Sequence, residues 1–329
     1  QDLSRSSCSD VSTLSDPGAF TNEGNELPPG VRAIGFGDSA FYKAPADTFA
    51  ALDANDPRRI QGAVAQVLIV AIGAELPDIP TPDQRDALFE KVKNKEIPSV
   101  IVLDRIRVTE DPQRNHNPSL SSIEENGVTV PEGGKLRFFP DRDTPLKLFS
   151  PDADFEQYDQ LTPEGADHKT ERIIAALYST TGRFEQPRLE VGSDTPENFQ
   201  APTGASNNPK PEDRRGTFWA VLRDTRGGQS AYELPFVLCD RSLPAPELFS
   251  LSPSEGLGDG TQRVTLTGRN LSSVMDVGVG GKALSQLTYD PARDVLEGFV
   301  PVLDPGEHPL LVRGEHCADV STTFTFKSH

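Results

Sequence analysis

The stretch Gly258-Asp-Gly-Thr-Gln-Arg-Val-Thr-Leu-Thr-Gly-Arg-Asn-Leu271 decides the fold of the C-terminal part of the chain. Val264 and Leu266 alternate with polar residues, and Gly, Asp and Asn stand on both sides of them. Alternation with a period of two between turn residues predicts a short strand with one buried face. Similar stretches follow one another through residues 244–326, which predicts a small antiparallel β-sandwich.

The length and composition bound the rest of the chain. Its 329 residues suggest two or three domains, at about 150 residues a domain. The hydrophobic content of 35%, with 29 Pro and 27 Gly, favours many short strands joined by turns over a helical or α/β enzyme. No apolar run reaches the ~18–20 residues of a membrane helix, so we expect no direct membrane insertion.

The N-terminal third divides into an extended polar arm, residues 1–30, and a small α+β or β domain, residues 31–110. Thr81-Pro82-Asp83-Gln84 predicts a helix start, because Thr81 can cap the helix and Gln84 can bond back to it. Asp56-Pro57 is a second helix start. Residues 60–72 fit a buried helix or, from Gln66, a strand, and β-branching favours the strand. Residues 99–109 predict a strand.

A second β-domain is predicted over residues 111–241, followed by a stiff linker with Pro244 and Pro246 and a last domain over residues 244–329. Residues 194–215 are polar and rich in Pro and Asn, which predicts an exposed loop. The strands predicted in the second domain cover residues 120–123, 127–130, 135–139, 146–149, 172–179, 188–191, 216–224 and 229–239.

The C-terminal module resembles the IPT/TIG immunoglobulin-like domain over almost its whole length. The matching residues are Pro246, Leu248, Leu251, Pro253, Gly256, Gly260, Thr261, Val264, Thr265, Leu266, Gly268, Asn270, Leu271, Val277, Val279, Gly280, Gly281, Pro305, Gly306, Pro309, Leu310, Leu311 and Val312. Leu257-Gly258-Asp259 departs from the simpler Gly-Gly turn of the family. The resemblance implies an Ig-like sandwich.

The middle module is similar to an Ig-like module of secreted and surface lipoproteins of myxobacteria. The residues that carry this likeness are 117–120, 177–184 and the run Trp219-Ala-Val-Leu-Arg-Asp224 with Arg226-Gly227-Gly228. It implies residence in the cell envelope. The fold class that we predict is therefore mainly β: tandem Ig-like β-sandwiches with a smaller N-terminal α+β or β unit that carries one or two helices.

Charge and cysteines bear on partners and compartment. The net charge is 32 − 50 = −18, which repels nucleic-acid phosphates and anionic lipid head groups. Cys8, Cys239 and Cys317 have no CxxC spacing, so we expect no zinc site and no thioredoxin-like motif. Three cysteines can form at most one intrachain disulfide. We favour Cys8 with Cys239, since that bond would attach the arm to a folded domain; three free thiols are the alternative. The chain begins without Met, as exported chains do after processing.

Candidate site residues are few. Asp152, Asp154 and Glu156 lie in one loop, where their oxygens could converge on Ca²⁺, although the EF-hand pattern is absent. No Gly-x-Ser-x-Gly elbow occurs and no His has metal-motif spacing, so we expect no catalytic residue, no cofactor and no other metal. Trp219 alternates with apolar neighbours, which favours core packing over a role in stacking against carbohydrate.

We therefore expect a non-enzymatic, exported bacterial protein in the periplasm, on the outer-membrane surface or outside the cell. Its Ig-like modules would serve as spacers and docking surfaces in a larger assembly with other envelope proteins or with copies of itself. The alternative is a carbohydrate-binding or adhesive surface protein with a glycan as partner. That alternative needs an aromatic platform, and its candidates Phe155, Tyr158 and Phe199 are scattered along the sequence.

Overall fold

The computed structural model describes residues 42–75, 81–162, 165–202, 214–317 and 319–329. The predicted arm, residues 1–30, lies outside the described residues, and so does Cys8. The chain divides after Arg114 into two compact units, residues 1–114 and 115–329. The predicted sandwich domains over residues 111–241 and 244–329 therefore share the second unit, apart from the few residues before Asn115.

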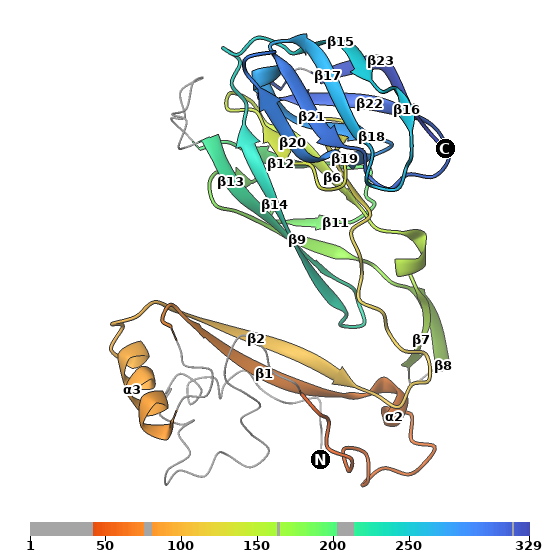
Figure 1. Cartoon of the computed structure of the whole chain (residues 1–329). Coiled ribbons are helices and arrows are strands. Elements are labelled where there is room, and N and C mark those ends of the chain that lie inside the picture. The colour runs from red at the N-terminus through yellow and green to blue at the C-terminus, as the bar shows by residue number, and fades with distance from the viewer. Residues whose placement is uncertain (1–41, 76–80, 163–164, 203–213, 318) are drawn as a thin grey trace. The chain divides into compact units, whose positions relative to one another are not determined.

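The first unit is built on a two-stranded antiparallel ribbon (Figure 1). Its strands β1 (Ala63–Ile72) and β2 (Ser99–Val108) pair over their whole length. The helix alternative for this stretch is wrong, and the strand begins three residues before Gln66. The high content of β-branched residues in both strands explains the outcome, because their stiff side chains fit the pleated ribbon better than a helix.

Two short helices accompany the ribbon, α2 (Arg58–Gln61) before β1 and α3 (Pro82–Lys93) between the strands. The predicted capping box of α3 is confirmed. The backbone N–H of Gln84 donates to the Thr81 hydroxyl at 3.4 Å, and the backbone N–H of Thr81 donates to the Gln84 side-chain oxygen at 2.9 Å.

The second unit begins with a β-sandwich of two five-stranded sheets, ordered β10-β12-β6-β3-β4 and β11-β9-β13-β14-β5. The strands are β3 (Ser122–Glu125), β4 (Val128–Thr129), β5 (Leu136–Phe138), β6 (Thr144–Phe149), β9 (Ile174–Ser179), β10 (Arg183–Phe184), β11 (Arg188–Glu190), β12 (Glu197–Gln200), β13 (Arg215–Arg223) and β14 (Gln229–Leu238). Phe138 and Phe199, one from each sheet, stack in the core with ring centroids 3.8 Å apart.

A second sandwich follows, with sheets ordered β15-β17-β21-β20 and β16-β23-β22-β18-β19. Its strands are β15 (Glu247–Ser252), β16 (Glu255–Gly256), β17 (Arg263–Arg269), β18 (Val274–Val279), β19 (Lys282–Ala283), β20 (Ser285–Asp290), β21 (Val295–Phe299), β22 (Gly306–Gly314) and β23 (Asp319–Ser328). Val264 and Leu266 are 1% and 0% exposed, as their alternation predicts. The predicted mainly β class is confirmed.

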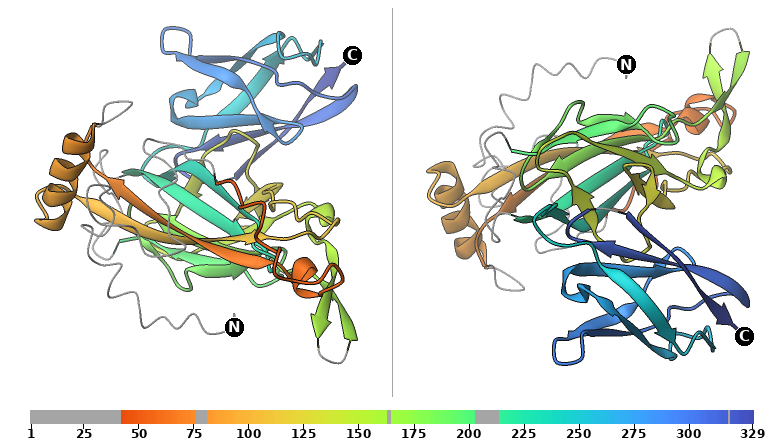
Figure 2. Two further views of the ribbon diagram at one scale, coloured as in Figure 1. Left: turned by 90° about the horizontal axis from the view of Figure 1, so that it is seen from below. Right: turned by 90° about the horizontal axis from the view of Figure 1, so that it is seen from above.

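Two elements differ from the sequence analysis. Part of the predicted loop over residues 194–215 is the strand β12, which Phe199 ties to the core. A hairpin of β7 (Gln157–Thr162) and β8 (Gly165–Thr170) projects from the first sandwich (Figure 2). The hairpin strands are almost wholly polar, so their sequence lacks the apolar alternation that marks a half-buried strand.

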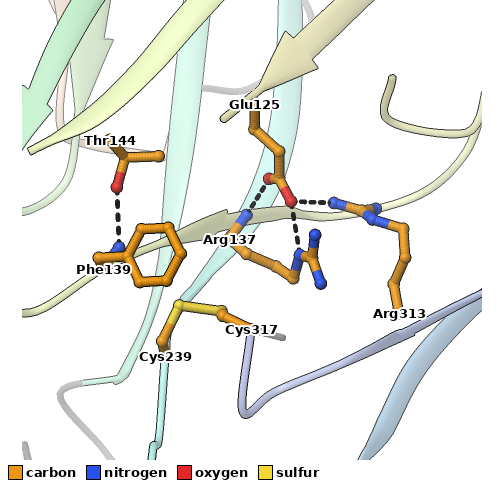
Figure 3. The surroundings of a disulfide bond; sticks show 7 residues. All are labelled: Glu125, Arg137, Phe139, Thr144, Cys239, Arg313 and Cys317. Atoms are coloured by element: carbon orange, nitrogen blue, oxygen red, sulfur yellow. Dashed lines mark hydrogen bonds and ion pairs between the residues drawn. A yellow bond between two sulfur atoms is a disulfide. The ribbon is translucent and has the colours of Figure 1, made fainter. Parts of the chain in front are cut away.

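A disulfide joins the two sandwiches, and it is not the one predicted. Cys239, directly after β14, is bonded to Cys317, three residues after the end of β22, with the Cα atoms 5.5 Å apart (Figure 3). Because Cys239 is bonded to Cys317, it cannot form the predicted disulfide with Cys8. The two cysteines form a small buried cluster with Phe139. Closing a loop of 78 residues restricts the unfolded chain by roughly 4 kcal/mol.

A buried group of four charges lies beside this disulfide. Glu125 and Arg137 come from the first sandwich, and Asp276 and Arg313 come from the second. One Glu125 oxygen accepts from Arg137 Nε and from Arg313 Nη2, each at 2.5 Å, and the other accepts from the Arg137 backbone N–H at 2.5 Å (Figure 3). Arg313 Nη1 donates to both oxygens of Asp276, at 3.2 and 3.0 Å.

These four side chains, which we call the junction cluster, are at most 5% exposed and carry no net charge. Backbone contacts extend the connection. Glu132 donates to the Gly281 carbonyl and accepts from the Ala283 N–H, each at 2.8 Å, so the first sandwich adds a short bridge to an edge of the second. A Cβ at Gly278 would stand 2.7 Å from Pro131, so only glycine allows this approach.

The junction cluster predicts a large effect for Arg313→Met. The change leaves the carboxyl group of Asp276 buried and without its main partner, and breaking a buried ion pair in this way costs about 3–5 kcal/mol in the free energy of unfolding. Denaturant unfolding measures this loss. Arg263→Met is the matched control, because it removes an arginine whose ion pair with Glu297 lies at the surface and contributes less than ~1 kcal/mol. Equal losses in the two variants would contradict a structural role for the cluster.

Candidate functional site: a sheet face and a carboxylate cluster

Two of the three predicted calcium ligands, Asp154 and Glu156, are held by other partners. Asp152 and Asp154 lie in a 3₁₀ turn, η3 (Asp152–Asp154). Asp154 accepts hydrogen bonds from the backbone N–H and the hydroxyl of Ser119, both at 2.6 Å. Among the described residues, no group of three or more His, Cys, Asp or Glu could hold a metal ion. The calcium prediction therefore gains no support.

Glu156, the third predicted ligand, belongs to a carboxylate cluster at the base of the β7–β8 hairpin. Glu156 directly precedes β7 and Glu171 directly follows β8, and the Glu171 N–H donates to the Glu156 carbonyl at 2.9 Å. Arg226 lies in the turn between β13 and β14. Its Nη1 is 3.1 Å from Glu156 Oε2 and 3.5 Å from Glu171 Oε1, while His116 pairs with the other Glu156 oxygen.

Asp224 fixes the turn that carries Arg226. One oxygen of Asp224 accepts from the backbone N–H groups of Arg226 and Gly228, at 2.8 and 2.7 Å. The other accepts from the Asn115 side-chain amide at 2.9 Å. The turn between β13 and β14 therefore binds two segments: Asn115 at the start of the second unit, and the base of the β7–β8 hairpin.

Glu171 is the least compensated member of this cluster. It is 2% exposed, and neither carboxylate oxygen has a hydrogen bond within normal geometry. Burial raises the pKa of Glu171 to about 7, the nearby charges of Asp224 and Glu156 add to the effect, and Arg226 opposes it. Folding of the hairpin base therefore favours the protonated form of Glu171.

The three aromatic candidates from the sequence do not form a platform. Phe199 is 0% exposed and belongs to the core, and Phe155 packs partly buried against that core. The guanidinium carbon of Arg226 lies 5.5 Å from the centroid of the Tyr158 ring. As expected from their scattered positions, they do not gather on one surface.

A different aromatic pair stands on the outer face of the sheet β11-β9-β13-β14-β5. Phe218, Ala220 and Leu222 point into the core, so Trp219 points outward. Trp219 lies directly opposite Tyr178 of β9 on one side and Glu233 of β14 on the other. The prediction that Trp219 packs in the core is wrong.

The three side chains form a row across neighbouring strands, because directly opposed residues in antiparallel strands share a face. Tyr178 is 54% exposed. Trp219 Nε1 donates to a Glu233 carboxylate oxygen at 3.2 Å, which orients the indole ring. We call Tyr178, Trp219 and Glu233 the aromatic row.

The next row along the same face consists of Ala176, Val221 and Ala231, opposite one another in register. Their side chains are short, so the tyrosine and indole rings rise above them. The arrangement offers a flat apolar surface with a hydroxyl, an indole N–H and a carboxylate at its edges. Such a surface can pack against a flat, partly apolar ligand and bind its polar groups at the rim.

No family model and no curated protein matches the chain. The IPT/TIG resemblance thus stays a prediction. No helix among the described residues has the length and apolar character needed to cross a membrane.

Solved structures show limited similarity. SGBP-B of the Bacteroides ovatus mixed-linkage glucan utilization locus, in complex with a mixed-linkage heptasaccharide, has 13% identity and a TM-score of 0.23, over 65% of this chain and 48% of that one. SGBP-B from a complex xyloglucan utilization locus in Bacteroides uniformis has 17% identity and a TM-score of 0.21, over 62% and 48%. The D0-D1 domain of intimin has 9% identity and a TM-score of 0.25, over 64% and 99%.

The chain thus spans about half the length of the two Bacteroides proteins. At these identities and TM-scores, the likeness carries no inference about what this chain binds.

The carboxylate cluster predicts a pH-dependent stability. The pKa of Glu171 is about 7 in the folded chain against 4.5 for an unperturbed glutamate. A raised folded-state pKa stabilises the protein fully below about pH 4.5, and this contribution is lost as the pH rises through 7. Glu171→Gln keeps the side chain neutral. We expect it to raise the stability at pH 8 by up to ~2 kcal/mol and to change little at pH 5.

Thermal unfolding of the wild type and the variant at both pH values measures this difference. Glu190→Gln serves as the control, because Glu190 accepts two hydrogen bonds from Arg172, which hold the pKa of Glu190 below its usual value. That variant should gain nothing at pH 8. A Glu171→Gln variant that is no more stable than the wild type at pH 8 would show that the buried carboxylate is compensated.

Proposed function

We propose that this protein is a non-enzymatic, exported surface protein that binds a carbohydrate on the outer sheet face of its first Ig-like sandwich. The aromatic row is the single observation that carries the proposal. Tyr178 is exposed and Trp219 is partly exposed, so both rings offer apolar surface to a ligand. The C–H face of a sugar ring packs well on such a surface. Glu233 and the tyrosine hydroxyl supply polar groups that can meet sugar hydroxyls.

The charge of the chain narrows the class of ligand. At a net charge of −18, the protein repels acidic polysaccharides. A neutral glycan pays no such electrostatic penalty, so we propose a neutral oligosaccharide or polysaccharide. The length of the aromatic row, one residue from each of three neighbouring strands, suits a chain of a few sugar units.

The disulfide supports the proposed location. Disulfides persist in oxidising compartments and are rare in the bacterial cytoplasm. The Cys239–Cys317 bond closes the junction between two folded sandwiches, so its loss would weaken the whole second unit. These observations favour the periplasm, the outer-membrane surface or the extracellular space.

An assembly subunit is the second candidate. The exposed apolar residues of the first unit favour it, since Ile69, Val100 and Val102 are 47%, 62% and 43% exposed. The two functions are compatible, because the aromatic row and these residues belong to different units of the chain.

The carbohydrate proposal predicts that Tyr178→Ala and Trp219→Ala weaken glycan binding by about fivefold each, since each removes roughly 1 kcal/mol of ring stacking. Affinity electrophoresis against a panel of neutral and acidic polysaccharides, followed by calorimetry on the best oligosaccharide, measures the effect. Phe249→Ala is the matched control. Phe249 has the same 54% exposure as Tyr178 but lies in β15 of the second sandwich.

Binding of a neutral glycan that Phe249→Ala preserves and Tyr178→Ala weakens would support the proposal. The proposal fails if the wild type binds no member of the panel, or if binding is equal in all variants.

A further inference from the structure

The aromatic row carries a negative charge that the stacking of a neutral sugar does not use. The Glu233 carboxylate accepts the Trp219 indole N–H through Oε2 at 3.2 Å, and Glu233 is exposed. In the part of the chain that the structure describes, Glu233 has no ion pair with a lysine, an arginine or a histidine. A positively charged group of a ligand can therefore reach this carboxylate.

The two rings of the row are also free of positively charged side chains. Arginines of this chain lie over the rings of Phe139, Tyr158 and Phe249. Among the described residues, none lies over Tyr178 or Trp219. The indole face is the aromatic surface that attracts a cation most strongly, so the row joins an open cation-binding face to an unpaired carboxylate.

The arginines that share this sheet face stand away from Glu233. Arg215 and Arg223 are each four residues from Trp219 in β13, roughly 14 Å along the strand at about 3.4 Å a residue. Arg188 belongs to β11, and the strands β9 and β13 lie between β11 and the strand of Glu233. The end of the row at β14 therefore keeps a negative charge that these arginines do not neutralise.

We infer that the Trp219–Glu233 end of the aromatic row binds an ammonium group carried by one unit of the glycan. The inference rests on the proposed function and adds to it one feature of the ligand: an otherwise neutral glycan contains a sugar with a free, protonated amino group. The quadrupole of the indole ring and the adjacent carboxylate attract this group together. The net charge of −18 attracts it further, whereas the same charge repels acidic sugars.

Three hexasaccharides test this inference, because they share a β-1,4-linked backbone and differ only at carbon 2 of each ring. The hexamer of glucose carries a hydroxyl group at that carbon, the hexamer of N-acetylglucosamine an acetamide group, and the hexamer of glucosamine an amino group. Trp219 is the single tryptophan of the chain, so its fluorescence reports directly on the row. Titration of the full chain with each hexamer gives the three dissociation constants.

At about pH 5.5 the amine of glucosamine is protonated, and the glucosamine hexamer should bind about tenfold more tightly than the other two. Added salt should reduce this preference, because the charges lie at the surface. Glu233→Gln keeps an oxygen that accepts the indole N–H but removes the charge, so the preference should fall to about threefold or less. Glu185→Gln is the matched control. Glu185 is exposed, directly follows β10 in the other sheet, and removes the same charge.

A preference that Glu185→Gln keeps and Glu233→Gln loses would support the inference. A wild type that binds the glucose hexamer as tightly as the glucosamine hexamer overturns it and leaves the carbohydrate proposal standing. Equal losses in the two variants overturn it as well, because the net charge of the chain would then explain the preference. The wild-type comparison decides the question even where a variant fails to fold.

A lysine hexamer separates recognition of a sugar from recognition of charge alone. If it binds at Trp219 as tightly as the glucosamine hexamer, the assignment to a glycan is overturned. If none of the three hexasaccharides changes the fluorescence of Trp219, the inference fails, whereas the carbohydrate proposal is still decided by the panel of polysaccharides.

Discussion

The structure of the second unit depends on the junction cluster of Glu125, Arg137, Asp276 and Arg313. Two charges from each sandwich meet where water is excluded, and their sum is zero. Buried charges are costly unless they are paired and hydrogen-bonded, so these four groups must keep their partners. This requirement specifies the position of one sandwich against the other more narrowly than apolar packing alone, and the disulfide and the Glu132 bridge act on the same joint.

A fixed joint between the two sandwiches also fixes the positions of their surfaces relative to each other. If the two sandwiches hold one arrangement, the aromatic row stands at a constant position with respect to the second sandwich, and a ligand need not select among many conformations. The β7–β8 hairpin is attached differently. Its base depends on Glu171, whose carboxyl group prefers to be protonated near neutral pH. The second unit thus contains two different joints. The junction cluster has balanced charges, whereas the base of the β7–β8 hairpin has an excess of carboxylate groups.

The sequence predicts the elements whose burial follows a simple period. Val264 and Leu266 in β17 and the capping box of α3 are such cases, because the information lies within a few residues. Prediction from the sequence fails where contacts between distant residues determine the structure. Phe199 sits alone in a polar run, and only its stack on Phe138 shows that the run contains a strand. Glu125 and Arg313 are 188 residues apart, so no local pattern announces their pairing. Trp219 stands in a strand whose residues alternate between the core and the outer face. Both sets are apolar near Trp219, so the sequence does not tell which set faces the core.

The most direct test of the central claim is the distance between the two sandwiches in solution. Spin labels at Arg188→Cys in β11 and Thr288→Cys in β20, both at exposed positions and in a Cys8→Ser background, report that distance by pulsed electron resonance. A joint fixed by buried charges predicts one narrow distance distribution, unchanged when salt is raised, because buried pairs are screened little. A broad or bimodal distribution in the intact, oxidised protein would contradict it.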